Sequence, residues 1–194
     1  MNPTQSYVSW GAILAGAAVA TAISVVLLQF GAAVGLAAIT DITPDTAISA
    51  WGVFAIGFWL LWVQLLSSVI GAYLAGRLRY RLSDATEQEV EIRDGAHGLL
   101  VWAVGTLLVV AGAAIVAFWA ALAPGAADAV TPAAIVTDTP EILAREKTVT
   151  VLYAFFAGAT SLVSAAASWF AATKGGDHRD NNVDSSDLSF RVRI

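Results

Sequence analysis

Residues 95–122 read GAHGLLVWAVGTLLVVAGAAIVAFWAAL and contain no Lys, Arg, Asp or Glu. Apolar residues occur all the way round a helix built from this stretch, whereas a surface helix of a soluble domain keeps one polar face. About 20 such residues cross the ~30 Å hydrocarbon core of a bilayer as an α-helix. The stretch therefore predicts a transmembrane helix.

Three further stretches share this uncharged, apolar character, and every charged side chain lies between or after the four. Hydrophobic residues make up 58% of the 194 residues and the mean hydropathy is +0.72, above the ~45–50% apolar content of globular domains. We predict an all-α polytopic membrane protein with one membrane domain over residues 1–173. Its four transmembrane helices are expected at about 8–36, 46–76, 95–122 and 148–173.

The cationic residues predict the orientation. Eight of the ten Lys and Arg side chains fall in the loop between spans 2 and 3 or after span 4, and two lie between spans 3 and 4. The positive-inside rule then places both termini in the cytoplasm. The segment 123–147 is expected on the external side, and 174–194 is expected to be a polar cytoplasmic tail that contains His178.

Local signals predict where the helices begin and end. Thr43-Pro44 and Thr139-Pro140 each place a capping hydroxyl before a proline suited to the first helical turn. Asp84 is positioned to cap a helix that continues into span 3. Lys174-Gly175-Gly176 combines a cation with two glycines and predicts the end of span 4.

Small residues recur at helical intervals in every span. Lipid is as apolar as Leu, so helices associate in a bilayer by close backbone approach through Gly, Ala and Ser. We predict a close-packed bundle in which these faces meet each other, another copy or another protein. The expected packing residues are Ala12, Gly16, Ala20, Ser24, Ser67, Gly71, Ala75, Gly98, Gly105, Gly112, Ala157, Ser161 and Ala165.

The spans offer little reactive chemistry. They hold no ionisable side chain in a membrane core, which argues against a proton-driven pump. Gln29 and Gln64 are the costliest polar groups to bury, and we expect them to pair between helices or to line a small wet cavity. The chain has no Cys, and no catalytic motif or metal-ligand cluster is apparent, so we expect no enzyme activity, cofactor or metal.

The polar residues near span 3 have structural interpretations. His97 stands where span 3 begins and is expected to hydrogen-bond to Asp94 or to the backbone. Arg77, Arg79 and Arg81 follow span 2 at the level of lipid headgroups, which favours contacts with anionic lipid. Acidic residues follow this short basic run, so nucleic-acid binding is not expected.

Three segments together resemble small multi-pass bacterial inner-membrane proteins of uncharacterised function, common in alpha-proteobacteria. They are Ser9-Trp10-Gly11-Ala12-Ile13 with Gly16, Gly71-Ala72-Tyr73-Leu74-Ala75-Gly76-Arg77, and His97-Gly98-Leu99-Leu100-Val101-Trp102-Ala103. The resemblance implies a four-helix membrane fold and a bacterial inner membrane, and it implies no catalytic residue.

Two functions follow as hypotheses. The first is a non-enzymatic structural or accessory membrane protein that self-associates or docks on a larger membrane complex. The alternative is a small oligomeric channel or passive transporter whose pore is lined by Gln29 and Gln64. The lipid bilayer is the one partner that both hypotheses require.

Overall fold

The computed structural model describes residues 7–38, 50–80, 86–122 and 140–182, and these form helices with short turns at their ends and no strand. The four helices are α1 (Trp10–Ala38), α2 (Ala50–Leu78), α3 (Glu87–Ala121) and α5 (Pro140–Asp180). Each contains a stretch long and apolar enough to cross a membrane, namely Trp10–Val34, Phe54–Leu78, Glu87–Ala121 and Ala154–Asp180. The predicted all-α fold with four membrane helices is confirmed, and the chain is a multi-pass membrane protein.

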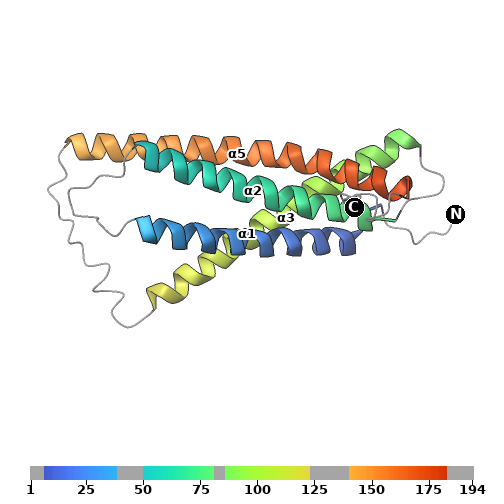
Figure 1. The fold of residues 1–194 in the computed structure, drawn as a ribbon, viewed down its shortest axis with the longest axis horizontal. Coiled ribbons are helices and arrows are strands. Elements are labelled where there is room, and N and C mark those ends of the chain that lie inside the picture. The colour runs from blue at the N-terminus through green and yellow to red at the C-terminus, as the bar shows by residue number, and fades with distance from the viewer. Residues whose placement is uncertain (1–6, 39–49, 81–85, 123–139, 183–194) are drawn as a thin grey trace, which may run out of the picture.

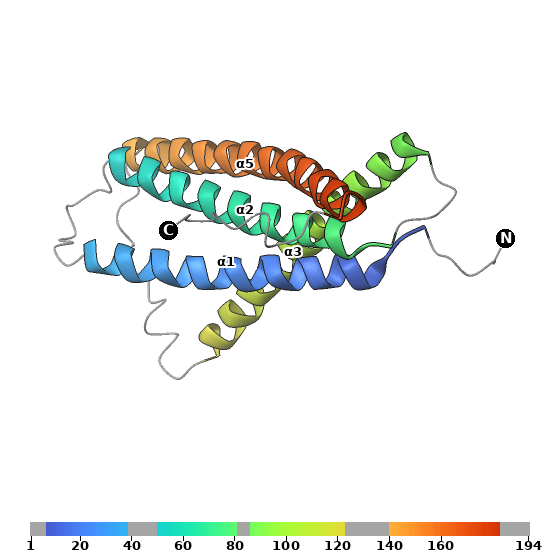
Figure 2. The same ribbon diagram turned by 45° about the vertical axis from the view of Figure 1, so that its right-hand side comes forward.

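The helices alternate in direction, so the start of α1 and α3 and the end of α2 and α5 lie together (Figure 1). We call this the closed end of the bundle and the opposite one the open end. Helix α2 packs against the other three helices, whereas the described parts of α1 and α5 make no contact with each other. Helix α3 crosses the others obliquely, so its last turns diverge from the bundle (Figures 1 and 2).

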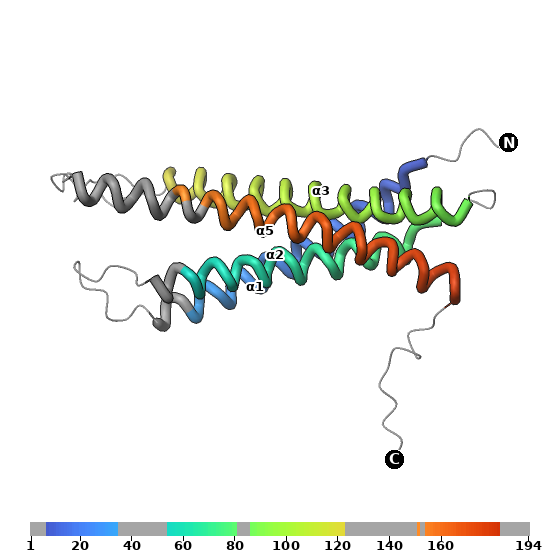
Figure 3. Tube along the Cα trace, turned by 90° about the horizontal axis from the view of Figure 1, so that it is seen from above, coloured from blue at the N-terminus to red at the C-terminus, as the bar shows by residue number. Residues whose placement is uncertain are grey.

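The buried core lies towards the closed end. Ile13, Ala72, Ala75, Val101 and Ala172 form its apolar cluster and are fully buried. In contrast, every residue of α3 from 111 to 122 is exposed on the single chain. Seen from above, α3 and α5 lie on one side and α1 and α2 on the other towards the open end, whereas at the closed end α1 begins beside α3 and α5 ends on the opposite side (Figure 3). The four helices therefore meet tightly over only part of their length.

Glycines set the spacing at the closed end. A methyl group built on Gly16 would overlap the carbonyl oxygen of Gly71, and one built on Gly98 would overlap that of Ser168. Similarly, a methyl group on Gly76 would overlap the carbonyl of Ala172. These backbones touch with no side chain between them, which is the packing that small residues permit in a bilayer.

The predicted end of span 4 at Lys174-Gly175-Gly176 is wrong, because α5 continues to Asp180. Gly175 and Gly176 are buried inside the helix, where a methyl group would overlap the carbonyl of Tyr73 and the carboxylate of Asp94 respectively. They allow α5 to approach α2 and α3 closely. A glycine pair after a long apolar run predicts a helix stop from local rules alone, and here tertiary packing overrides it.

The other boundary predictions have mixed outcomes. Helix α5 begins at Pro140, as Thr139-Pro140 predicts, so residues 140–147 of the segment expected on the external side are helical and continuous with the fourth span. Helix α3 begins at Glu87, and its N-cap is Thr86, whose side chain accepts a hydrogen bond from the Glu89 N–H. Asp84 and Thr43-Pro44 lie outside the described residues.

The glycine contacts predict a sharp difference between two positions fourteen residues apart on α3. Gly98→Ala forces the α3 and α5 backbones apart, whereas Gly112→Ala meets nothing within 4 Å of the added methyl group. We expect Gly98→Ala to lower the melting temperature in detergent clearly. Gly112→Ala should leave it unchanged or raise it, since Ala favours a helix over Gly by up to ~1 kcal/mol. Equal effects of the two substitutions on thermal unfolding would contradict this packing.

Candidate functional site

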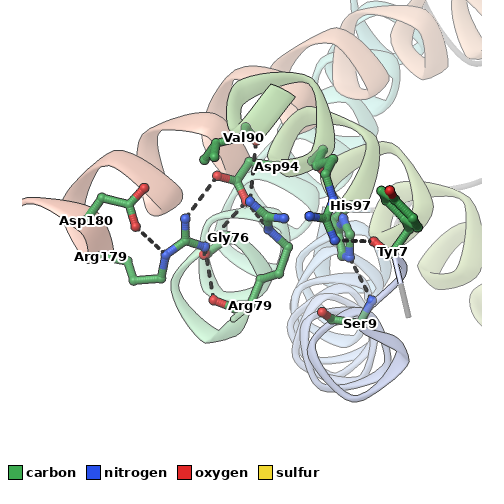
Figure 4. A network of polar contacts seen from close by, with 10 residues as sticks. Tyr7, Ser9, Gly76, Arg79, Val90, Asp94, His97, Arg179 and Asp180 are labelled. Carbon is green, nitrogen blue, oxygen red and sulfur yellow. Dashed lines mark hydrogen bonds and ion pairs between the residues drawn. The ribbon is translucent and has the colours of Figure 1, made fainter. Parts of the chain in front are cut away.

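A cluster of charged side chains joins three helices at the closed end (Figure 4). Asp94 lies in the second turn of α3, Arg79 directly follows α2, and Arg179 lies near the end of α5. We call these three residues with Asp180 the charged cluster. The oblique crossing of α3 brings its first turns between the ends of α2 and α5, which places Asp94 between the two guanidinium groups.

Arg79 and Asp94 form the most deeply buried ion pair among the described residues. Arg79 Nε donates to Asp94 Oδ1, and the two side chains are 0% and 2% exposed. Arg79 Nη2 also donates to the carbonyl oxygen of Val90, 3.4 Å away and one turn before Asp94 on α3. Because a lone buried charge is strongly disfavoured, each of these two residues requires the other.

Arg179 connects the pair to α2 and α5. Its Nη2 lies 3.3 Å from Asp94 Oδ2, and its Nε donates to Asp180 Oδ1 at 2.7 Å. Its Nη1 lies 3.0 Å from the carbonyl oxygens of Gly76 and Arg79, at the end of α2. A cation there satisfies carbonyls that have no partner inside their own helix and interacts favourably with the helix dipole.

A second set of contacts attaches the start of α1 to α3. The Ser9 N–H donates to His97 Nε2 at 2.9 Å, and His97 Nδ1 lies 2.6 Å from the carbonyl oxygen of Arg93. Nε2 is therefore an acceptor and Nδ1 carries the proton, which defines a neutral imidazole. Arg93 donates to the carbonyl of Tyr7 at 2.8 Å and lies over the Tyr7 ring, 5.0 Å from its centroid.

These contacts settle the interpretation of His97. Both ring nitrogens are engaged by backbone groups, in agreement with the prediction of a structural histidine, and the backbone rather than Asp94 is the partner. His178, which we expected in a polar tail, lies on α5 with Nδ1 3.0 Å from the Tyr73 hydroxyl. Within the described part of the chain, no group of three or more His, Asp or Glu side chains is arranged to hold a metal ion.

The expectation of lipid-headgroup contacts is wrong for Arg79, which is 1% exposed and paired with Asp94. Arg77 is half-buried, and Arg81 lies outside the described residues. Three buried guanidinium nitrogens, Arg79 Nη1 and Arg93 Nε and Nη1, have no hydrogen-bond partner among the described residues. Such groups cost about 1–3 kcal/mol each, so the other contacts of the closed end must offset them.

One feature of the sequence indicates the charged cluster, although the absence of charged residues from the four spans does not reveal it. Asp94 lies four residues before Gly98, so both occupy the same face of α3. An acidic residue that extends a stripe of packing glycines is directed into the bundle rather than into water. Its partners come from 15 residues earlier and 85 residues later in the chain, a separation that no local pattern reports.

Deeper in the bundle, hydroxyl and amide groups form a polar seam through all four helices. Ser24 donates to Ser67 at 2.9 Å, and Gln64 Nε2 donates to the Thr106 hydroxyl at 3.2 Å. On the other side, the Trp102 indole donates to Ser164 at 3.0 Å. Ser24, Gln64, Ser67 and Thr106 line a void of about 10 Å³, which is close to the room needed by one water molecule.

Most of the predicted packing residues are buried in the single chain. The fully buried ones are Ala12, Gly16, Ala20, Ser24, Ser67, Gly71, Ala75, Gly98 and Gly105. Ser161 and Ala165 are half-buried, because the buried face of α5 is formed by Ser164, Ser168 and Ala172 instead. Gly112 and Ala157 are exposed, so they do not pack between helices of one chain. Gln29 is also exposed and is not brought together with Gln64.

The contacts at the closed end hold the helix ends together, and we call the charged cluster with the contacts of His97 and Arg93 the clasp. Its polar groups satisfy one another and the ends of helices, and within the described residues none is a nucleophile beside a free base. No protein family matches this chain, and no curated protein or solved structure is significantly similar to it. The function of this chain is therefore inferred from its own structure.

The clasp predicts unequal effects for two Asp→Asn substitutions. Asp94→Asn leaves Arg79 as a buried charge without its counterion, which should destabilise the fold by roughly 3–5 kcal/mol. Asp177→Asn removes a pair with Lys174 whose side chains are 60% and 63% exposed, and such pairs contribute at most ~1 kcal/mol. Reversible unfolding in mixed detergent micelles measures both. If Asp94→Asn lowers the free energy of unfolding by less than ~1 kcal/mol, the proposed role of the charged cluster in stability is wrong.

Proposed function

We propose that this chain is a non-enzymatic accessory protein of a bacterial inner membrane that associates with a second copy or with other membrane subunits. The association uses the open ends of its helices. The observation that carries this proposal is that Gly112 and Gly158, towards the open end, have no neighbour in their own chain, whereas most closed-end glycines do. Gly11 at the closed end is also open, and Gly31 towards the open end meets the Trp59 side chain. At the closed end Gly16, Gly71, Gly76, Gly95, Gly98, Gly175 and Gly176 are in close contact with neighbouring helices.

At the open end, Gly112 and Gly158 have nothing within 4 Å of a methyl group built on them. A glycine inside a helix costs up to ~1 kcal/mol relative to Ala, and close packing compensates for this cost at the closed end. Gly112 continues the seven-residue spacing of Gly98 and Gly105, both of which are buried. A partner helix against Gly112 extends the same mode of packing beyond the single chain.

The charged cluster supports this role because it holds α2, α3 and α5 together at one end, where the contacts of His97 and Arg93 attach the start of α1. The open ends are then presented as preformed surfaces, and little conformational freedom is lost when they bind a partner. The described residues hold no arrangement that favours catalysis. The alternative, a channel or passive transporter, draws on the polar seam at Gln64, but Gln29 does not contribute to that seam.

The location in a bacterial inner membrane draws support from the resemblance of the three segments quoted above. The cytoplasmic position of both termini draws support from the distribution of Lys and Arg. The start of α1 and the end of α5 lie at the same end of the bundle (Figure 1), which agrees with an even number of crossings.

Self-association is tested by Gly112→Leu. We expect the wild-type protein extracted in mild detergent to have the mass of an oligomer or of a complex with other subunits. Gly112→Leu should reduce that mass to one chain while the melting temperature is retained, since the added side chain meets no residue of its own chain. The matched control is Ala114→Leu, which is also exposed but lies on the opposite side of α3. A monomeric wild-type protein, or an unchanged mass for Gly112→Leu, would contradict the proposal.

The orientation is tested with introduced cysteines, which report cleanly because the chain has none of its own. In spheroplasts treated with a membrane-impermeant maleimide, Thr131→Cys should be labelled at once. Asn182→Cys should be labelled only after the membrane is permeabilised. The opposite pattern would reverse the predicted topology.

A further inference from the structure

A cavity of about 320 Å³ lies among the four helices beside the polar seam, and it is open on one side, where its lining residues Val110 and Phe156 are 60% and 55% exposed. Its lining includes Leu28 from α1, Leu60 and Gln64 from α2, Val109 from α3, and Phe156 and Thr160 from α5. Ser24 and Gln64 line both this cavity and the water-sized void. The volume falls within the ~300–1,000 Å³ typical of small-molecule sites.

The cavity results from the same geometry that closes the other end. Helix α3 departs from the bundle in its second half, where residues 111–121 are exposed, and the small residues Gly57 and Ala157 are among those that line the space beside it. Gly57 lines the cavity with nothing within 4 Å of a methyl group built on it, and Ala157 lines it as well. Larger side chains at these two positions would fill the space.

The chemistry of the lining is apolar with a few convergent polar groups, and none of the lining residues is charged. The polar members are Ser24, Gln64, Thr160 and Ser161. Among the described residues, Gln64 makes one side-chain hydrogen bond, from Nε2 to Thr106. The amide therefore keeps one N–H donor and its carbonyl acceptor for another group.

We propose that this cavity binds a neutral amphiphile with a single apolar chain and one uncharged hydrogen-bonding group. The apolar chain lies against Leu60, Val109 and Phe156, and the polar group pairs with the Gln64 amide. A charged head group is excluded because no counterion lines the site and an unpaired charge at this depth is costly. A purely apolar molecule would leave the amide without its partner.

This inference is independent of the proposed association. Gly112, Gly158 and Ala114 do not line the cavity, so variants at these positions test association without altering it. Conversely, a larger side chain at a cavity-lining position occupies the space between the helices of one chain. Failure of either proposal therefore leaves the other intact.

The experiment uses the full chain in lipid nanodiscs with three probes of equal chain length: 1-dodecanol, dodecane and dodecyltrimethylammonium. We expect 1-dodecanol, at a hundredfold excess over its Kd, to raise the melting temperature by about 5–10 °C. The two other probes should raise it much less. Equal shifts with dodecane or with the cationic probe would overturn the proposal, as would the absence of a shift with 1-dodecanol.

Three variants assign the effect to the site. Gly57→Leu fills the cavity and Gln64→Leu removes the polar partner at similar volume, and both should abolish the 1-dodecanol shift. Gly158→Leu adds the same side chain outside the cavity, where nothing lies within 4 Å of its first carbon atom, and should retain the shift. If Gly57→Leu does not fold, Ala157→Leu fills the same space. A shift that persists in Gln64→Leu, or that is lost in Gly158→Leu, overturns the proposal.

Discussion

The buried carboxylate of Asp94 is the constraint on which the closed end depends. It accepts from Arg79 after α2 and from Arg179 on α5 while it belongs to α3, so one side chain connects three of the four helices. Arg179 also binds the last carbonyls of α2. Since charges buried near a membrane core are tolerated only in mutual contact, these helix ends are held in one relative arrangement.

The glycines make that arrangement possible. Gly176 leaves room for the Asp94 carboxylate, and Gly76, Gly98 and Gly175 let the α2, α3 and α5 backbones touch. Any side chain at these positions would separate the cationic and anionic groups that the clasp brings together. The small residues and the charged residues therefore depend on each other. Close packing of the helices brings the charged side chains together, and the ion pairs then hold the helices in that position.

The oblique path of α3 divides the molecule into two functional regions. Its first half lies among the other helices and forms the clasp and the polar seam. Its second half leaves them, which opens a cavity beside Gln64 and exposes Gly112 on the outside. In the proposed function, the closed end supplies rigidity and the open end supplies a surface for association, whereas the ligand site beside Gln64 is a separate proposal.

The sequence by itself determined the all-α membrane fold, the four spans and most of the packing stripes. These depend on hydropathy, helical spacing and residue size, which are properties of each segment alone. The same reasoning identified Pro140 as a helix start and His97 as a structural histidine.

Only the tertiary structure decided that Gly175 and Gly176 continue α5, that Arg79 is buried, and that Gly112 and Ala157 are uncovered. Each of these depends on the angle at which one helix crosses another. That angle is set by contacts between residues up to 105 positions apart, and no local sequence pattern contains it. For the same physical reason, a Lys-Gly-Gly segment that ends a helix by local rules lies here inside one, against the carboxylate that holds the bundle together.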